Sequence, residues 1–349
     1  FMIGGEMVAV ARLLSVFAAV ISTVSLFVIV TMVSYGADDD PIADFGWFGA
    51  LAAALLFALS PLAVLWSRLT ALESFVTAFS TICMACLCMA IQRRDWKWWF
   101  GAGLAAGLAV AAKVSGLVTV FTIGGFLAGW WLIKRDWYPF QMGFVTLMGI
   151  AAAWLPFLLL LGWQDSIGDF LMLASGPERL APLMNWPEKI ADLATWAGKR
   201  PAVVLALAGA CWAVTSRDLR QWLLAVWFLL EGLFLVSASG IEFGWGGSSH
   251  YALPFIAAAC VMAGIAVGQL ANVFGQRSVR SRWMAATAAL LVLIFTAPGF
   301  LYDIQYALFR GTYPTASQNQ EKEIGRVIAA SVPPEASILV FGNAAFYHW

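Results

Sequence analysis

Long apolar stretches separated by short polar connections dominate the chain. A bilayer core about 30 Å thick is crossed by about 20 apolar residues in a helix. Ten stretches approach that length, near residues 7–33, 46–66, 70–92, 98–113, 115–133, 140–161, 201–215, 220–239, 250–271 and 283–301. The pattern predicts an all-α polytopic membrane bundle of about ten transmembrane helices, in which 98–113 and 201–215 are the shortest.

The carboxyl end changes character. Residues 318–330 have the spacing of an amphipathic helix, Pro333 and Pro334 indicate a turn, and 336–342 form an apolar run that ends in glycine. A helix, a turn and a buried strand in this order predict the start of a small extracytoplasmic α/β domain, truncated after one strand. We therefore expect a transmembrane domain over 1–302 and the beginning of this second domain over 303–349.

The segment 162–200 is too long and too mixed in character for a tight connection between two helices. It is rich in tryptophan and proline, which is typical of interfacial helices whose rings lie at headgroup depth. We expect it to form an outer loop of the transmembrane domain. Its role is left open between a lid and an aromatic belt.

Composition agrees with the pattern of apolar stretches. Hydrophobic residues make up 62% of the chain and charged residues 11%, whereas a soluble domain carries about 25% charged residues. The formal net charge is zero, so nothing predicts a nucleic-acid partner. Three of the five cysteines lie in one apolar segment, which favours packing over disulfides or a metal site, and we expect no metal.

Lysine and arginine fall mainly in alternate short connections. Because short cytoplasmic loops hold such residues, this side is predicted to be cytoplasmic. The basic residues on that side are Arg93, Arg94, Lys97, Lys134, Arg135, Arg217, Arg220, Arg277, Arg280 and Arg282. The carboxyl-terminal domain then lies on the extracytoplasmic side.

Ionisable residues at the mouth of a bundle cost about 3 kcal/mol or more unless they are paired or wetted, so each is a functional candidate. Arg68 and Glu73 lie five residues apart at an outer junction, where they either share a water-filled cavity with a substrate or form a salt bridge between two helices. Lys113 follows a glycine-rich run, Gly101–Gly107, that predicts close helix packing. It either meets a lipid phosphate or extends to the interface.

A second outer connection, 242–251, brings a carboxylate, an imidazole and hydroxyl groups to the start of the next helix. Glu242, His250 and Tyr251 are candidate substrate-binding residues there, although a loop histidine is often only a polar surface group. Arg12 and Glu231 lie inside apolar segments as secondary candidates, which either pair with each other or face the cavity.

The order of these residues resembles the polytopic glycosyltransferases that use polyprenyl-phosphate sugars, the protein O-mannosyltransferase and aminoarabinose lipid A transferase group of C-type enzymes. Ala11-Arg12-Leu13 resembles the start of their second helix, and Arg68 with Glu73 resembles their Ser-Arg-x5-acid element, with glutamate in place of the usual aspartate. The segment from Gly103 to Lys113 and the sequence His250-Tyr251-x-x-Pro254 resemble two further family elements, the latter with histidine in place of arginine or lysine.

The resemblance implies a membrane glycosyltransferase in the bacterial cytoplasmic membrane. An acceptor hydroxyl, on a protein, lipid or glycan outside the cytoplasm, attacks the sugar of a polyprenyl-phosphate donor with inversion. Lys113 and Arg68 are then the candidates for the donor phosphate, with His250 and Tyr251 beside them, and Glu73 and Glu242 orient the sugar or acceptor. The family's catalytic acid lies in the first outer loop, which is expected upstream of Phe1, so no catalytic residue is assigned.

Two other classes stay open. The same fold can serve as a non-catalytic subunit of a larger membrane complex that binds membrane lipids and other subunits, and a transporter is a third reading. Against the transporter, the two halves of the chain show no repeat and no matching pair of broken helices. No phosphate-binding glycine loop, His-Glu-x-x-His or paired-cysteine motif is present, so no cofactor is expected besides the donor substrate.

Overall fold

The computed structural model describes residues 5–34, 46–67, 72–161, 186–198, 200–237, 249–275 and 301. It separates into two units, Phe1–Phe300 and Leu301–Trp349, and of the second only Leu301 is described. The predicted α/β piece and the predicted span before Leu301 therefore lie outside the described residues. Within them the chain is helical and has no strand.

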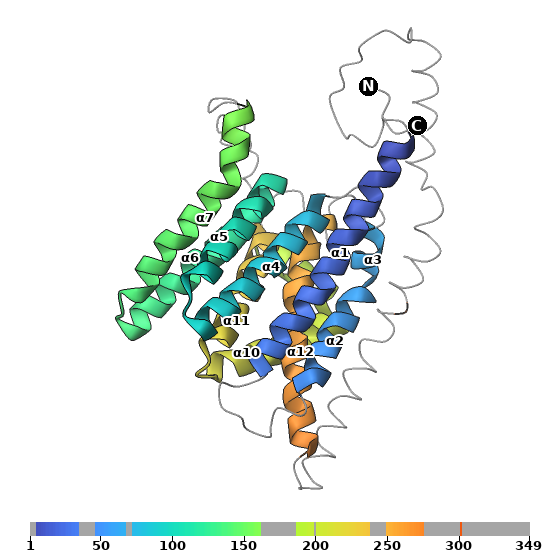
Figure 1. Ribbon diagram of the computed structural model, residues 1–349. Helices are drawn as coiled ribbons and strands as arrows, with labels where there is room; N and C mark the ends of the chain where they lie inside the picture. The colour runs from blue at the N-terminus through green and yellow to red at the C-terminus, as the bar shows by residue number, and fades with distance from the viewer. Residues whose placement is uncertain are drawn as a thin grey trace, which may run out of the picture. The chain divides into compact units, whose positions relative to one another are not determined.

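The described residues of the first unit form a bundle of helices (Figure 1). Its elements are α1 (Gly5–Ser34), α2 (Gly46–Ala58), α3 (Pro61–Ser67), α4 (Leu72–Arg93), α5 (Trp96–Ala112), η2 (Val114–Gly116), α6 (Leu117–Lys134), α7 (Tyr138–Leu161), α9 (Trp186–Gly198), α10 (Pro201–Thr215), α11 (Leu219–Ser237), η5 (Ser249–Ala252) and α12 (Leu253–Gly275). Helix α9 occupies the second part of the predicted outer loop 162–200.

Six of the described helices, namely α1, α4, α6, α7, α11 and α12, are long and apolar enough to cross a bilayer. A seventh crossing is formed if α2 and α3 count as one bent span. The chain is thus a multi-pass membrane protein. Helices α5 and α10, predicted as the shortest spans, have 17 and 15 residues. The predicted total of about ten spans stays a prediction.

The stretch expected as one helix over 46–66 is instead two helices that meet at an angle of 56°. Helix α2 ends at Ala58, and α3 begins at Pro61. Proline lacks a backbone N–H and its ring excludes the preceding turn, so a helix that reaches it from the amino side stops or bends. The bend places the carboxyl end of α3 near the start of α4, where Ser74 Oγ donates to the carbonyl of Trp66 at 3.5 Å.

Helix α12 lies at the centre of the bundle, packed against α2, α10, α11 and α1. Residues 255–263 of α12 are all buried, and most of them are small. Contact with the neighbours is close: a Cβ on Gly209 would overlap the carbonyl of Met262, and one on Gly264 would approach Ala53 Cβ to 2.8 Å. Small residues thus allow the helix backbones to touch, as expected within a bilayer.

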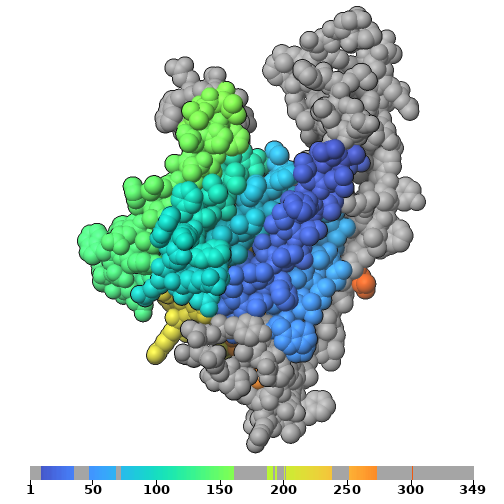
Figure 2. All heavy atoms as spheres, viewed as in Figure 1, coloured from blue at the N-terminus to red at the C-terminus, as the bar shows by residue number. Residues whose placement is uncertain are grey.

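Helices α7, α5, α4 and α1 form a row in which each packs on the next (Figure 2). The predicted role of the glycine-rich segment is confirmed here, because Gly103 and Gly107 on α5 face α7. A Cβ on Gly103 would overlap the carbonyl oxygen of Thr146, and one on Gly107 would lie 2.6 Å from Ala153 Cβ. The row holds α5 in a fixed position relative to α4.

The contacts also confirm the alternating path of the helices. The connection between α4 and α5 lies beside the start of α7, with the Arg94 guanidinium 5.8 Å from the Tyr138 ring centroid. Arg220, at the start of α11, donates from Nη1 to the carbonyl of Met32 in the last turn of α1 at 2.6 Å. The connections that hold Arg93, Arg94, Lys97, Lys134, Arg135, Arg217 and Arg220 thus share one end of the bundle, called here the basic end.

Candidate functional site

Glu73 and Lys113 meet at the end of the bundle opposite the basic end. Glu73 lies in the first turn of α4, and Lys113 is the extended residue between α5 and η2, with φ −164° and ψ 148°. Lys113 Nζ forms a salt bridge with Glu73 Oε1. Forty residues separate the two in sequence, so the row of α4 and α5 is what brings them together.

The local backbone explains why Lys113 reaches this position. The N–H of Lys113 donates to the carbonyl of Ala109 at 3.1 Å, and the N–H of Gly116 donates to the carbonyl of Lys113 at 2.8 Å. A Cβ on Gly116 would overlap the backbone of Ala109. Only glycine therefore permits this tight turn, which fixes the lysine at the junction of α5 and α6.

The ion pair is partly exposed on one side only. The Glu73 side chain is 5% exposed and that of Lys113 is 25% exposed. Burying a carboxylate without a partner costs several kcal/mol, so the ammonium group offsets that cost. The exposed part of the Lys113 side chain is where an anionic ligand can approach it.

Tyr251 is the third member of the site. It lies in η5 just before α12, and the Lys113 ammonium is 4.1 Å from the centroid of its ring. A cation over the face of an aromatic ring is attracted by about 0.5–2 kcal/mol, depending on solvent exposure. The site thus unites α4, the α5–α6 junction and the start of α12.

A buried polar stripe continues from Glu73 along α4. The Thr77 hydroxyl donates to the carbonyl of Glu73 at 2.7 Å, and the Ser80 hydroxyl lies 2.6 Å from that of Thr119 on α6. All three hydroxyl residues are completely buried. Hydroxyl pairs between helices stabilise packing in a bilayer by about 0.6–2 kcal/mol, so this stripe fixes α6 against α4 below the ion pair.

The other leading candidates lie wholly or partly outside the described residues. Arg68 lies between α3 and α4, and Glu242 between α11 and η5, both outside them. The backbone of His250 belongs to η5, directly before Tyr251, but its side chain is not described. Their proximity to the ion pair stays a prediction.

Arg12 and Glu231 do not come together in the described part of the chain. Arg12 is exposed on α1, whereas Glu231 is 3% exposed within α11. Glu231 Oε1 accepts from the indole N–H of Trp227 at 3.2 Å, one turn earlier in the same helix. The partner of the buried carboxyl is therefore an indole, which sequence reasoning did not identify.

Ser115 is a residue of the site region that sequence reasoning also missed. It lies in η2, two residues after Lys113, and its buried hydroxyl has no hydrogen-bond partner among the described residues. A buried hydroxyl without a partner costs about 1–3 kcal/mol, so it is a candidate donor to a ligand. The sequence signal for Ser115 was its position two residues after Lys113, in Lys113-x-Ser115-Gly116.

The amino-terminal part of the chain carries a family signature. Residues 1–159, which include Glu73 and Lys113, match the family model described as dolichyl-phosphate-mannose-protein mannosyltransferase. The resemblance to polyprenyl-phosphate-sugar glycosyltransferases is confirmed. Comparison with curated protein sequences gives no significant match.

Solved structures of C-type glycosyltransferases share the fold of the chain. An oligosaccharyltransferase from Archaeoglobus fulgidus, in a complex with Zn and sulfate, matches with a TM-score of 0.62 and 16% identity over 95% of this chain and 45% of that one. ArnT from Cupriavidus metallidurans, in the apo state, matches with a TM-score of 0.57 and 17% identity over 93% of this chain and 66% of that one. The archaeal AglB in complex with an inhibitory peptide and a dolichol-phosphate matches with a TM-score of 0.55 and 13% identity, over 95% of this chain and 48% of that one.

These likenesses establish that the bundle shares the fold of these solved structures. The chain spans less than two thirds of the length of each of these solved chains. The fold alone does not fix the reaction, which depends on the residues at the site.

Proposed function

We propose that the chain is a membrane glycosyltransferase that moves a sugar from a polyprenyl-phosphate donor to an acceptor on the side opposite the basic end. The observation that carries the proposal is the Lys113–Glu73 ion pair with Tyr251, at the mouth of the bundle. Both charged residues lie within the segment that matches the mannosyltransferase family model.

In this proposal Lys113 binds the donor phosphate. The acceptor oxygen bonds to the anomeric carbon, the bond from that carbon to the phosphate oxygen breaks, and a base takes the hydroxyl proton. Negative charge then stays on the departing lipid phosphate. An ammonium held in place by Glu73 and the Tyr251 ring stabilises this charge without reorganisation, which is the main electrostatic means of lowering such a barrier.

The remaining candidates have supporting roles in the same proposal. Arg68 adds a second positive charge for the phosphate, and His250 stands beside it. Glu73 holds Lys113 in position, and Glu242 orients the sugar or the acceptor. Because the basic end is the predicted cytoplasmic end, the mouth opens on the outer face of a bacterial cytoplasmic membrane, the side where the carboxyl-terminal domain is also expected.

The test is transfer of radiolabelled sugar from a panel of polyprenyl-phosphate donors by the full-length protein in one detergent. Lys113→Ala is expected to reduce turnover at least 100-fold, because one preorganised group at a developing charge contributes about 10²–10³ in rate. Lys113→Arg keeps the charge and is expected to retain part of the activity.

A matched control is available on the same helix. Lys97 is an exposed lysine in the first turn of α5, at the basic end, and Lys97→Ala is expected to keep wild-type turnover. Turnover within a factor of two of wild type in Lys113→Ala would overturn the assigned role. No turnover by the wild-type protein with any donor would favour the non-catalytic subunit of a membrane complex.

A further inference from the structure

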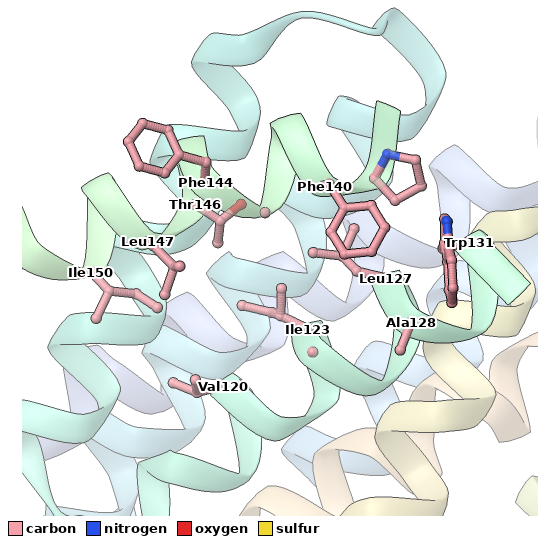
Figure 3. A pocket seen from close by; sticks show the side chains of 13 residues that line it. Val120, Ile123, Leu127, Ala128, Trp131, Phe140, Phe144, Thr146, Leu147 and Ile150 are labelled. Atoms are coloured by element: carbon pink, nitrogen blue, oxygen red, sulfur yellow. The ribbon is translucent and has the colours of Figure 1, made fainter. Parts of the chain in front are cut away.

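A long apolar groove lies between α6 and α7 (Figure 3), and none of the residues of the candidate site lines it. It has a volume of about 540 Å³, within the range of about 300–1,000 Å³ that ligand sites occupy. Among its lining residues Thr146 contributes the one hydroxyl, which donates to the carbonyl of Met142 at 2.8 Å. Ile123 and Leu127 on α6 and Leu147 on α7 are among the residues that line it.

Small residues create this groove. A Cβ on Gly124 would meet nothing within 4 Å, and Ala128, four residues later on α6, also lines the groove. On α7, Gly143 faces Leu127 where larger side chains would close the gap. Because no water fills the core of a bilayer, an apolar groove of this kind suits a hydrocarbon chain.

The length of the groove matches one leaflet. It extends on α6 from Val120 to Trp131, which at 1.5 Å per residue is about 16 Å. On α7 it extends from Pro139 to Ile150, which is the same number of residues. The hydrocarbon core is about 30 Å thick, so the groove spans about one half of it, ending at the basic end.

Positive charge lies at that end of the groove. Lys134 is the last residue of α6, and Arg135 follows it with its guanidinium carbon 5.5 Å from the centroid of the Trp131 ring. Both basic side chains are exposed, and Trp131 itself lines the groove. The nearest acid in sequence, Asp136, accepts the N–H of Tyr138 at 3.1 Å at the start of α7. Two cations thus stand where a lipid headgroup would lie.

We infer that the α6–α7 groove binds one acyl chain of an anionic phospholipid from the leaflet at the basic end, with the phosphate held by Lys134 and Arg135. The positive charge at the basic end selects an anionic headgroup, because each basic residue near a membrane surface raises the affinity for an acidic lipid about 5-fold. This site lies at the opposite end from Lys113, so it stands apart from the proposed transfer reaction.

The test compares retained lipid by native mass spectrometry of the full chain, after exchange into detergent with phosphatidylglycerol or phosphatidylcholine of identical acyl chains. The wild-type protein is expected to retain phosphatidylglycerol about 25-fold more tightly. Lys134→Ala with Arg135→Ala is expected to remove this preference and leave phosphatidylcholine binding unchanged. Gly124→Leu is expected to abolish binding of both lipids, because the leucine occupies the groove.

Gly129→Leu is the matched control. Gly129 lies on the same helix, a Cβ there also meets nothing within 4 Å, and it is not among the groove residues. Wild-type lipid retention in Gly129→Leu and its loss in Gly124→Leu would support the inference. Three outcomes would overturn it. The first is equal lipid retention in the two variants, and the second is equal affinity of the wild-type protein for the two phospholipids. The third comes from the same exchange with a polyprenyl phosphate: Gly124→Leu loses the polyprenyl phosphate and keeps phosphatidylglycerol. Lys113→Ala is expected to leave lipid retention unchanged, which separates this test from that of the transfer reaction.

Discussion

The Glu73–Lys113 pair allows a structural role to be separated from a role in substrate binding. Lys113→Met leaves a carboxylate that is only 5% exposed without the Lys113 ammonium. Removing one partner of a buried pair lowers the free energy of unfolding by about 3–5 kcal/mol. We expect the lower value of about 3 kcal/mol here because the Lys113 side chain is 25% exposed. Glu73→Gln removes the buried charge and leaves a partly exposed lysine, so a loss of about 1 kcal/mol in the free energy of unfolding is expected.

The double variant Glu73→Gln with Lys113→Met removes both charges and keeps the volume of both side chains. Since replacing a buried pair by groups of similar size is often neutral, its stability is expected to return to within about 1 kcal/mol of wild type. The coupling between the two sites is then about 3–4 kcal/mol, which is the sum of the two single losses less the loss in the double variant. Equilibrium unfolding in mixed dodecyl sulfate micelles measures it, and a coupling below about 0.5 kcal/mol would refute the reasoning.

The activity of the double variant decides the role of the pair. If the pair only locks α4 to the α5–α6 junction, restoring stability also restores sugar transfer. Under the proposed function the double variant is folded and still at least about 100-fold less active, since the charge that meets the phosphate is gone.

Three further predictions concern the bundle itself. Gly103→Val is expected to destabilise the protein by about 3 kcal/mol because a Cβ there overlaps α7. Gly124→Ala places its Cβ in open space and is expected to be neutral or to stabilise by about 0.5 kcal/mol. Unfolding in dodecyl sulfate measures both changes. Trp227→Phe is expected to cost about 1–3 kcal/mol in the same assay because Glu231 loses its donor, and adding Glu231→Leu should recover most of it; no recovery would contradict this assignment. Arg220→Met is expected to cost about 2 kcal/mol and to increase amide exchange in the last turn of α1, and unchanged exchange there would show that the bond to that turn is unimportant.

Hydrophobic length identified most of the fold from the sequence. The apolar stretches predicted near 140–161 and 201–215 coincide closely with α7 and α10, because about 20 or fewer apolar residues between polar connections allow few other structures. The bend between α2 and α3 was missed, although Pro61 was a signal for it. The predicted span ignored proline because hydropathy alone does not register a missing backbone donor.

The members of the site were predictable, but one of their pairings was not. Glu73 and Lys113 stand out as charges among apolar residues, which is a signal in sequence. Arg68, predicted to share a cavity or a salt bridge with Glu73, lies outside the described residues, so that prediction stays untested. The structure brings Lys113 to Glu73 from 40 residues away. That contact depends on the glycines that let α5 pack tightly and on the turn at Gly116. A linear sequence does not show which residues these features bring together.

The partners of buried hydrogen bonds are harder still to predict from the sequence. Glu231 was expected either to pair with Arg12 or to face a cavity, and it accepts instead from Trp227 in its own helix. Tryptophan is so frequent in this chain, with 18 residues, that an indole one turn away gave no distinct signal. Which side chains one helical turn apart meet depends on rotamers that only the packed bundle selects.

The most direct test of the central claim is sugar transfer by the full-length protein, measured side by side for wild type, Lys113→Ala and Lys97→Ala with a radiolabelled polyprenyl-phosphate sugar. Wild type and Lys97→Ala are expected to turn over, and Lys113→Ala is expected to lose at least about 100-fold of the activity while the protein stays folded. Equal turnover in all three proteins would contradict the central claim.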